Sequence, residues 1–247
     1  MKKVFWEDPY RQELTTEVAE VTGNQILLKE TIAYSFSGGQ ESDQAQINGL
    51  EVIASEMRDK RIFYTLPEGH SLAVGDQVQM TIAWPRRYRL MRLHFAAELV
   101  LEIVTQKYQL KKVGAHIAEN KARIDFEYDE HISTLFEPIL DEYNQIIAAD
   151  MTIHTGFSDQ QNQRRFWKID GFAVVPCGGT HVRSTKEVGY VTLKRSRAGK
   201  KIERIEIRLK LDFANFGSTD FSLEGPHCSF NFIGRGFEPL PMKLNEQ

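Results

Sequence analysis

The hydrophobic pattern changes its period at Pro85, and this change constrains the fold more than any other feature of the sequence. Before it, Val78, Met80 and Ile82 alternate with polar or small residues, as in a half-buried strand. After it, apolar residues recur with the spacing of one helical face over residues 86–108. Proline lacks an N–H group and therefore fits the first turn of a helix. We predict a domain boundary near residue 85.

The patterns on the two sides of this boundary assign the chain to the α+β class. Residues 1–85 hold short alternating segments separated by glycine turns, which predicts a small all-β domain. Residues 86–211 mix both periods, with predicted helices at 86–108 and 136–147, strands at 122–128, 166–169, 173–175, 190–193 and 202–209, and a basic hairpin turn at 194–201. The remaining segment, 212–247, contains six of the fifteen phenylalanines, and we expect it to pack back on the body.

Composition excludes several classes of protein. Hydrophobic residues make up 41% of the chain and charged residues 26%, so there is enough apolar material for a core. The sequence lacks a membrane-spanning apolar run and a signal peptide, which predicts a cytoplasmic protein with no membrane partner. Two cysteines exclude a disulfide framework. The net charge of -3 argues against DNA as a partner but leaves room for a local basic face.

The strongest local motif follows the predicted strand at 173–175. Residues 177–181 read Cys-Gly-Gly-Thr-His, so that the thiol of Cys177 and the imidazole of His181 stand four positions apart. A tight Gly-Gly turn can bring both groups to one ion, and both are ligands suited to zinc. One such pair also occurs by chance or for structural reasons, so a metal site requires a second pair.

A second pair lies on the predicted helix, where His94 and Glu98 are four positions apart and project from one face. Both side chains can bind a metal. In the alternative interpretation, His94 is a hydrogen-bonded core histidine and Glu98 pairs with a nearby arginine. Position favours the metal, because Glu98 lies on the inward stripe between Ala97 and Leu101, where an unpaired carboxylate is costly.

Taken together, these residues resemble the AlaX family of stand-alone alanyl-tRNA editing proteins, which are related to the editing domain of alanyl-tRNA synthetase. The resemblance covers the chain to about residue 211. It rests on the Cys-Gly-Gly-Thr-His block and on residues 92–99, which resemble the family's His-x-x-x-His helix. The Ser-Gly-Gly-Gln sequence at 37–40 and the basic strand at 200–209 also resemble family motifs.

The resemblance implies a small N-terminal β-barrel followed by an α/β two-layer sandwich that binds Zn²⁺. The implied reaction is hydrolysis of the ester that joins a wrong amino acid, serine or glycine, to the tRNA for alanine. Three positions match the family's zinc ligands directly: His94, Cys177 and His181. A glycine-rich motif that lies near the editing site in the longer family members matches Gly38, Gly39 and Gln40.

The chain departs from the family pattern at Glu98, where the family has a second histidine. A Glu98 ligand beside the Cys177 thiolate would make a zinc complex formally neutral, and a less positive centre acidifies bound water less. Alternatively, the other three ligands leave a coordination position open, and Glu98 is the general base. A third interpretation is a metal-free descendant without activity.

Phe95 is a second departure, since the family usually has a small hydroxyl-bearing residue there. It stands about 100° round the helix from His94, so it either packs in the core or lines the amino-acid pocket. In the pocket, an apolar wall would weaken selection for a serine hydroxyl. We place Phe95 and Thr180 among the residues expected to contact the substrate.

Two basic clusters flank the predicted metal residues and suit contacts with RNA phosphates. The first, at the start of the helix, includes Arg86 and Arg87, and the second includes Arg195, Lys200 and Lys201. The sequence therefore predicts a zinc-dependent deacylase of mischarged tRNA. The alternative is a tRNA-binding homologue that has lost hydrolysis, and the sequence leaves the oligomeric state open.

Overall fold

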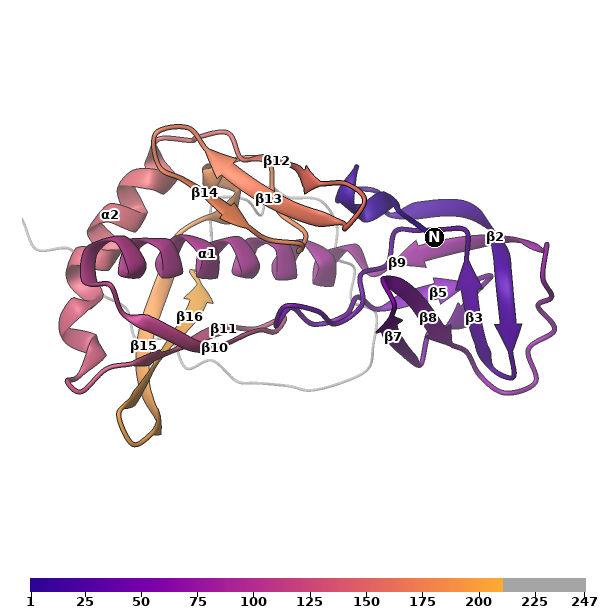
Figure 1. Ribbon diagram of the computed structural model, residues 1–247, viewed down its shortest axis with the longest axis horizontal. Coiled ribbons are helices and arrows are strands. Elements are labelled where there is room, and N and C mark those ends of the chain that lie inside the picture. Colours follow the sequence, from indigo (N-terminus) through magenta and orange to yellow (C-terminus); the bar gives the residue numbers. More distant parts are fainter. Residues whose placement is uncertain (211–247) are drawn as a thin grey trace, which may run out of the picture. The chain divides into compact units, whose positions relative to one another are not determined.

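A computed structural model describes residues 1–210, which belong to one compact unit, Met1–Leu211. These residues form three α-helices and sixteen strands, so the expected mixture of α and β structure is confirmed (Figure 1). No helix of the described part is long and apolar enough to cross a membrane. The predicted packing of the phenylalanine-rich segment 212–247 concerns residues outside the described range.

The N-terminal part is built on a seven-stranded antiparallel sheet with the order β6-β5-β9-β2-β3-β8-β7. Its strands are β2 (Glu13–Thr22), β3 (Gln25–Leu28), β5 (Ala45–Ile47), β6 (Leu50–Glu51), β7 (Ala54–Arg58), β8 (Arg61–Thr65) and β9 (Gln77–Ile82). The predicted alternation in β9 is confirmed, because Val78, Met80 and Ile82 are buried. A bulge between Val18 and Glu20 increases the twist of β2, and the sheet curls as a half-barrel.

Before this sheet, the chain forms the short strand β1 (Lys2–Lys3) and the 3-10 helix η1 (Val4–Trp6). Strand β1 pairs in parallel with β4 (Glu30–Thr31). Two buried clusters of apolar side chains follow the sequence division: one draws on residues 4–82 and the other on residues 90–207. The division at residue 85 into two independent domains stays a prediction.

Helix α1 (Trp84–Tyr108) begins with proline in its first turn, as the sequence predicts. It contacts a four-stranded sheet of order β10-β11-β16-β15, and Phe95 and Glu98 on it contact Trp167 of a three-stranded sheet of order β12-β13-β14. Figure 1 shows α1 running between these two sheets. Because the helix is covered on two sides, its buried residues extend well beyond a single stripe.

The elements around α1 include all the predicted helices and strands, together with two short helices, η2 and α3, and two strands that the sequence did not predict. They are β10 (Lys111–Ile117), β11 (Ala122–Glu127), η2 (Ile132–Leu135), α2 (Phe136–Ala148), β12 (His154–Asp159), β13 (Arg164–Ile169), β14 (Ala173–Pro176), α3 (Thr185–Val188), β15 (Val191–Gly199) and β16 (Ile202–Leu209). Strands β10 and β12 were not predicted. Strand β10 buries only its last residue and β12 buries none, so neither shows the apolar alternation that identifies a strand in a sequence.

The predicted hairpin is confirmed, but its turn is shorter than the predicted 194–201, because β15 continues through most of this segment. Lys194 pairs with Glu206 and Arg195 with Ile205, and the reversal is confined to the residues around Lys200. Cross-strand pairing with β16 overrides the turn signal of the basic residues. Arg195 therefore lies on a strand.

Candidate metal centre

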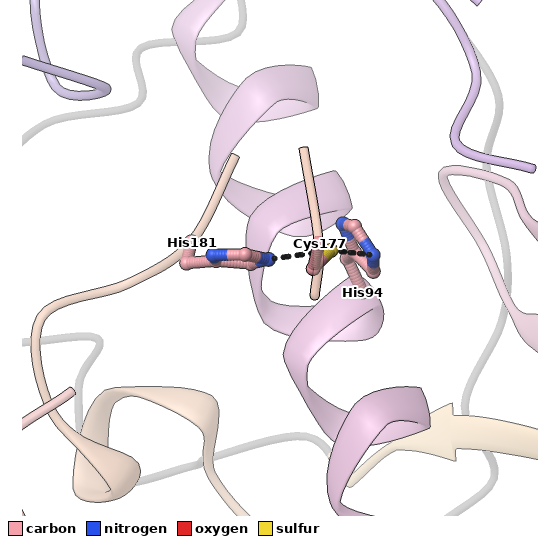
Figure 2. Close-up of side chains that lie close together, drawn as sticks. All are labelled: His94, Cys177 and His181. Carbon is pink, nitrogen blue, oxygen red and sulfur yellow. Dashed lines mark hydrogen bonds between the residues drawn. The ribbon is translucent and has the colours of Figure 1, made fainter. Parts of the chain in front are cut away.

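Three predicted ligands meet beside α1. The helix supplies His94, and the loop after β14 supplies Cys177 and His181. The Sγ atom of Cys177 lies 3.6 Å from Nε2 of His94 and 3.3 Å from Nε2 of His181. Figure 2 shows the thiol between the two imidazoles. One donor atom of each residue lies within 4.8 Å of the others, and this group is the candidate metal centre.

Glycine makes this close approach possible at residue 179. A Cβ atom at Gly179 would lie 2.0 Å from Cε1 of His94 and 2.9 Å from Oε1 of Gln40, so any larger residue would displace the imidazole. The neighbouring carbonyl of Gly178 accepts a 2.8 Å hydrogen bond from Nε1 of Trp6. The loop is thus held against the helix and against the N-terminal segment.

Glu98 joins the centre from the side of His94 and Cys177. Its Oε1 lies 3.3 Å from Nε2 of His94 and 3.7 Å from Sγ of Cys177, while its Oε2 accepts a 3.0 Å hydrogen bond from Nε1 of Trp167. Glu98 does not belong to the group of three residues whose donor atoms all lie within 4.8 Å of one another. Since Trp167 occupies one carboxylate oxygen, the other is directed at the donor atoms.

Gln40, from the glycine-rich motif, fixes the orientation of His94. Its Oε1 accepts the backbone N–H of Thr180 at 3.2 Å, which identifies this atom as the oxygen, and it lies 2.7 Å from Nδ1 of His94. Nδ1 must therefore carry a proton, and Nε2 is the ring nitrogen that faces the centre. The amide Nε2 of Gln40 donates to Oγ1 of Thr180 at 2.9 Å.

The neighbouring turn brings this glutamine into place. Gly39 packs against β10, where a Cβ atom would approach the carbonyl oxygen of Ala115 to 2.8 Å. Gly38 has a φ of 58°, and a Cβ atom there would meet nothing within 4 Å, so this glycine serves the turn only. Of the predicted motif, Gln40 is the residue that reaches the ligands.

We expect Gln40→Met to weaken zinc binding by about 10- to 100-fold, the usual cost of losing a partner that orients a metal-binding histidine. The change keeps the side-chain volume but leaves Nδ1 of His94 without its acceptor. Competition with a chromogenic chelator measures the affinity. Gln46→Met, at an exposed position of β5, is the matched control, and equal affinities for the two variants would contradict the role of Gln40.

The charges of the centre support one another. Burial alone would raise the pKa of Cys177, but His94 and His181 lower it to about 6. Burial likewise opposes the charged forms of the other two groups, yet Cys177 and Glu98 raise the pKa of His94 to about 10, and His94 and Trp167 lower the pKa of Glu98 to about 2. The surroundings thus favour the thiolate, which is the form that binds metal.

The donor set fits zinc. Bond lengths of about 2.3 Å to sulfur and about 2.0 Å to nitrogen in a tetrahedral complex separate the two donors by about 3.5 Å. The two sulfur-to-nitrogen distances here, 3.6 Å and 3.3 Å, lie on either side of this value. Two imidazoles and a thiolate are also the ligand types that zinc prefers. Three protein ligands, with the fourth position left to water or substrate, are the pattern of catalytic zinc sites.

Phe95 is fully buried beneath the centre. Its ring makes edge-to-face contacts with Trp167 at 5.1 Å and with His181 at 5.4 Å. Of the two positions that the sequence allowed, the structure shows core packing, in direct contact with a ligand. The predicted contact of Phe95 with the substrate has no exposed surface to support it.

Arg86 and Arg87 differ in their surroundings. Arg86 is partly exposed and pairs with Glu41 and Glu119 at 2.8 Å each. The prediction that Arg87 contacts RNA is wrong for this structure, because its guanidinium is fully buried. It donates to both oxygens of Asp43 and to the carbonyl groups of Pro9 and Ile32. Through these hydrogen bonds, the buried guanidinium in the first turn of α1 links the helix to the N-terminal part.

We expect Arg87→Met to lower the free energy of unfolding by about 3–5 kcal/mol, because it leaves the buried carboxylate of Asp43 without its partner. Urea denaturation followed by circular dichroism measures the change. The matched control is Arg89→Met, two positions along, whose exposed ion pair with Glu119 is worth less than about 1 kcal/mol. A similar, small loss in both variants would refute a structural role for Arg87.

The second predicted basic cluster lies on the β15–β16 hairpin. Arg195 donates to Glu203, Lys201 pairs with Asp129, and Lys200 is exposed. A hollow beside the two lysines is also lined by three carboxylates: Glu127, Asp129 and Glu130. No interaction among residues 1–210 links this cluster to the ligands, and its carboxylates reduce its attraction for phosphate.

Sequence reasoning missed two residues that support the centre: Trp167, which contacts the Glu98 side chain, and Trp6, which contacts the backbone of the ligand loop. Trp167 was assigned only to a strand, although alternation in β13 puts it on the inward face with Arg165 and Ile169. Trp6 received no role. The alternation could have placed Trp167 near the helix, whereas the contact of Trp6 with the ligand loop depends on a long-range approach that no spacing reveals.

Comparison with known proteins agrees with this site. The family model described as "Threonyl and Alanyl tRNA synthetase second additional domain" matches residues 165–206, which include Cys177 and His181. The chain thus contains a domain of the class found in these synthetases. The AlaX-M alanyl-tRNA editing protein of Pyrococcus horikoshii is 34% identical over 214 residues, which cover 85% of this chain and 98% of that protein. The chain belongs to the AlaX family of alanyl-tRNA editing proteins, as its sequence motifs predict.

Two further relatives show the same relationship. The AlaX-M alanyl-tRNA editing protein of Saccharolobus solfataricus is 29% identical over 235 residues, covering 85% of this chain and 99% of that protein. The alanine–tRNA ligase of Methanococcus maripaludis is 28% identical over 225 residues, which cover 82% of this chain but 25% of the ligase. The likeness to the ligase therefore concerns one part of a longer protein.

Proposed function

We propose that this protein is a zinc-dependent deacylase that hydrolyses mischarged tRNA for alanine in trans, releasing serine or glycine. Two observations support the proposal: membership of the AlaX family and the His94–Cys177–His181 group with its glutamate. The observation that carries it is the convergence of three zinc-type donors from two separate segments of the chain, helix α1 and the loop after β14. Serine or glycine as the amino acid follows only from the resemblance.

In this proposal, His94, Cys177 and His181 would hold the metal. When bound, zinc supplies a Lewis acid for the ester carbonyl and acidifies water. Gln40 holds the Nδ1 proton of His94, so that Nε2 is the nitrogen available to a metal, and Trp167 directs Oε1 of Glu98 at the donors. Glu98 is then either a fourth ligand or the base that takes a proton from water.

We also propose an arrangement for the whole protein. The curled seven-stranded sheet acts as a barrel-like domain, 1–85, that delivers the Gln40 loop, and the sheets around α1 act as the sandwich of an editing domain, 86–211. The substrate is an aminoacylated tRNA, and the protein works in the cytoplasm. Arg86, Arg195, Lys200 and Lys201 are proposed to meet the RNA outside the metal centre, as the sequence suggested.

The decisive experiment measures serine release from seryl-tRNA for alanine, with and without a chelator, on protein whose bound zinc is counted in the same preparation. We expect one zinc per chain and release that the chelator suppresses. Zinc-loaded protein that binds this tRNA without releasing serine or glycine would refute the deacylase. It would instead favour a binding homologue whose activity ended when Glu98 and Phe95 arose.

A further inference from the structure

Two aromatic rings and two cations gather where the N-terminal segment meets β12 and β13. The rings of Trp6 and Phe157 meet edge to face at 5.8 Å. The guanidinium of Arg165 lies 4.6 Å from the centroid of Phe157 and 5.4 Å from that of Trp6, and the Nζ atom of Lys3 lies 4.3 Å from that of Trp6. We call these four residues the aromatic–cation cluster.

The aromatic–cation cluster touches the ligand loop of the metal centre. Nε1 of Trp6 donates to the carbonyl of Gly178, next to Cys177. The backbone N–H of Cys177 donates to the carbonyl of Arg165 at 3.0 Å. A molecule bound on the cluster therefore lies beside the candidate metal centre.

The two cations of the cluster are buried and lack a carboxylate partner among residues 1–210. Arg165 is 7% exposed and Lys3 6% exposed. Arg165 donates to the carbonyl of Trp6 at 3.1 Å, and Lys3 donates to the side-chain oxygen of Gln163 at 2.8 Å, both neutral acceptors. Arg87, the other buried arginine of the described residues, binds Asp43 directly. The Cys177 thiolate acts on Arg165 from the neighbouring centre, but no carboxylate of the described residues does, and buried charge is costly, so an anion bound at the cluster would stabilise it.

A third positive charge, that of Lys60, adds to the positive potential at the cluster. Burial, together with the charge of nearby Lys60, lowers the pKa of Lys3 to about 8. Lys60 is exposed and donates only to the side-chain oxygen of Asn162 among the described residues. Three cations whose hydrogen-bond acceptors are all neutral indicate an anionic ligand.

The exposed ring of Phe157 indicates a second property of the expected ligand. It is 38% exposed, on β12 at the edge of its sheet, while Arg165 lies over its ring. An accessible aromatic ring beside cations is the combination that binds unpaired nucleotides, through base stacking and phosphate contacts. A base pair inside a duplex offers no free face for such stacking.

We propose that the aromatic–cation cluster binds the unpaired 3′-terminal nucleotides of the tRNA, with a base stacked on Phe157 and a phosphodiester held by Arg165 and Lys3. The inference rests on the proposed function, because the amino acid is esterified to the 3′-terminal ribose. Binding of this end next to Cys177 places the ester at the metal centre. The cluster, rather than the β15–β16 hairpin, then positions the reacting end.

Two variants test the cluster, Phe157→Leu and Arg165→Met. The matched controls are Phe63→Leu and Arg58→Met, which alter another cation–aromatic pair with a separation of 3.9 Å on β7 and β8. Fluorescence anisotropy measures the Kd for tRNA for alanine with its 3′ end intact and for the same tRNA without its unpaired 3′ nucleotides. We expect both cluster variants to raise the Kd for intact tRNA by about tenfold, with no change for the shortened tRNA or in the controls.

Salt dependence provides a second readout. Loss of one phosphate contact to a single strand should reduce the slope of log Kd against log salt by about 0.7 in Arg165→Met and leave it unchanged in Phe157→Leu. Unchanged Kd values, or equal losses with both RNAs, would overturn the proposal. Because Phe157 is partly exposed, its variant remains informative if Arg165→Met fails to fold.

The same preparations separate this inference from the proposed function. If the wild-type protein releases serine while both cluster variants bind intact tRNA normally, the cluster proposal is wrong and the deacylase stands. If the wild-type protein prefers the intact 3′ end through the cluster but releases no amino acid, the deacylase is wrong and the binding site stands.

Discussion

Cys177→Ala is expected to abolish zinc binding and deacylase activity together. The thiol is the nearest common neighbour of the two histidines, at 3.6 Å and 3.3 Å, and it is the anionic member of the group of three. Its loss leaves two imidazoles to hold a divalent ion. The loss in affinity should exceed the roughly 10- to 100-fold cost of losing an orienting partner. Metal content of the purified variant and serine release measure the two effects.

The control for this prediction is Cys228→Ala, which alters the chain's second cysteine. No ligand pair accompanies Cys228 in the sequence, so this variant should keep one zinc per chain and full activity. Circular dichroism checks that Cys177→Ala is folded. A folded Cys177→Ala protein that retains stoichiometric zinc would show that the metal, if any, is held elsewhere.

The ligands could be predicted because their signals are local. Four-residue spacing on a helix fixes the common face of His94 and Glu98, and the double glycine fixes the turn between Cys177 and His181. Bringing the two pairs together required the family resemblance. The structure then agrees, since the predicted helix at 86–108 coincides with α1 except for its first two residues.

Spacing could not predict the supporting contacts, because they join segments far apart in the chain, and only the resemblance put Gln40 near the site. Gln40 reaches across 54 positions to His94, and Trp167 across 69 positions to Glu98. The prediction for Arg87 failed for another reason. A charged residue in a cluster of arginines was expected at the surface. Its side chain is buried because Asp43 and two carbonyl groups satisfy its donors inside the fold. Partners of this kind depend on tertiary packing and leave no periodic pattern.

Glu98→Gln should lower the rate of serine release by about 100-fold or more, in the range found when a general base is removed. Glutamine keeps the volume of the side chain, and its carbonyl oxygen can still accept the N–H of Trp167. The change removes only the negative charge that faces His94 and Cys177. Single-turnover deacylation with saturating protein measures the chemical step without a contribution from binding.

Metal content decides which role the glutamate has. A general base that stands outside the group of three ligands can be neutralised without loss of zinc, whereas a fourth ligand cannot. Glu98 lies close to two ligands but does not belong to the group whose donor atoms all lie within 4.8 Å of one another. This position favours the role of general base over that of a fourth ligand. We therefore expect Glu98→Gln to keep its zinc. Loss of zinc together with activity would assign Glu98 as a ligand.

Glu98→His tests whether the departure from the family pattern is a loss or a working substitution. We expect this variant to be less active than the wild-type protein, because the imidazole lacks the second oxygen that Trp167 binds and removes the negative charge beside His94. Glu102→Gln, one turn further along α1, changes a carboxylate that accepts a hydrogen bond from Gln106 and should leave activity intact. A gain of activity in Glu98→His would instead identify a degenerate site. In that case, the change to glutamate would have ended the editing activity, while tRNA binding was retained.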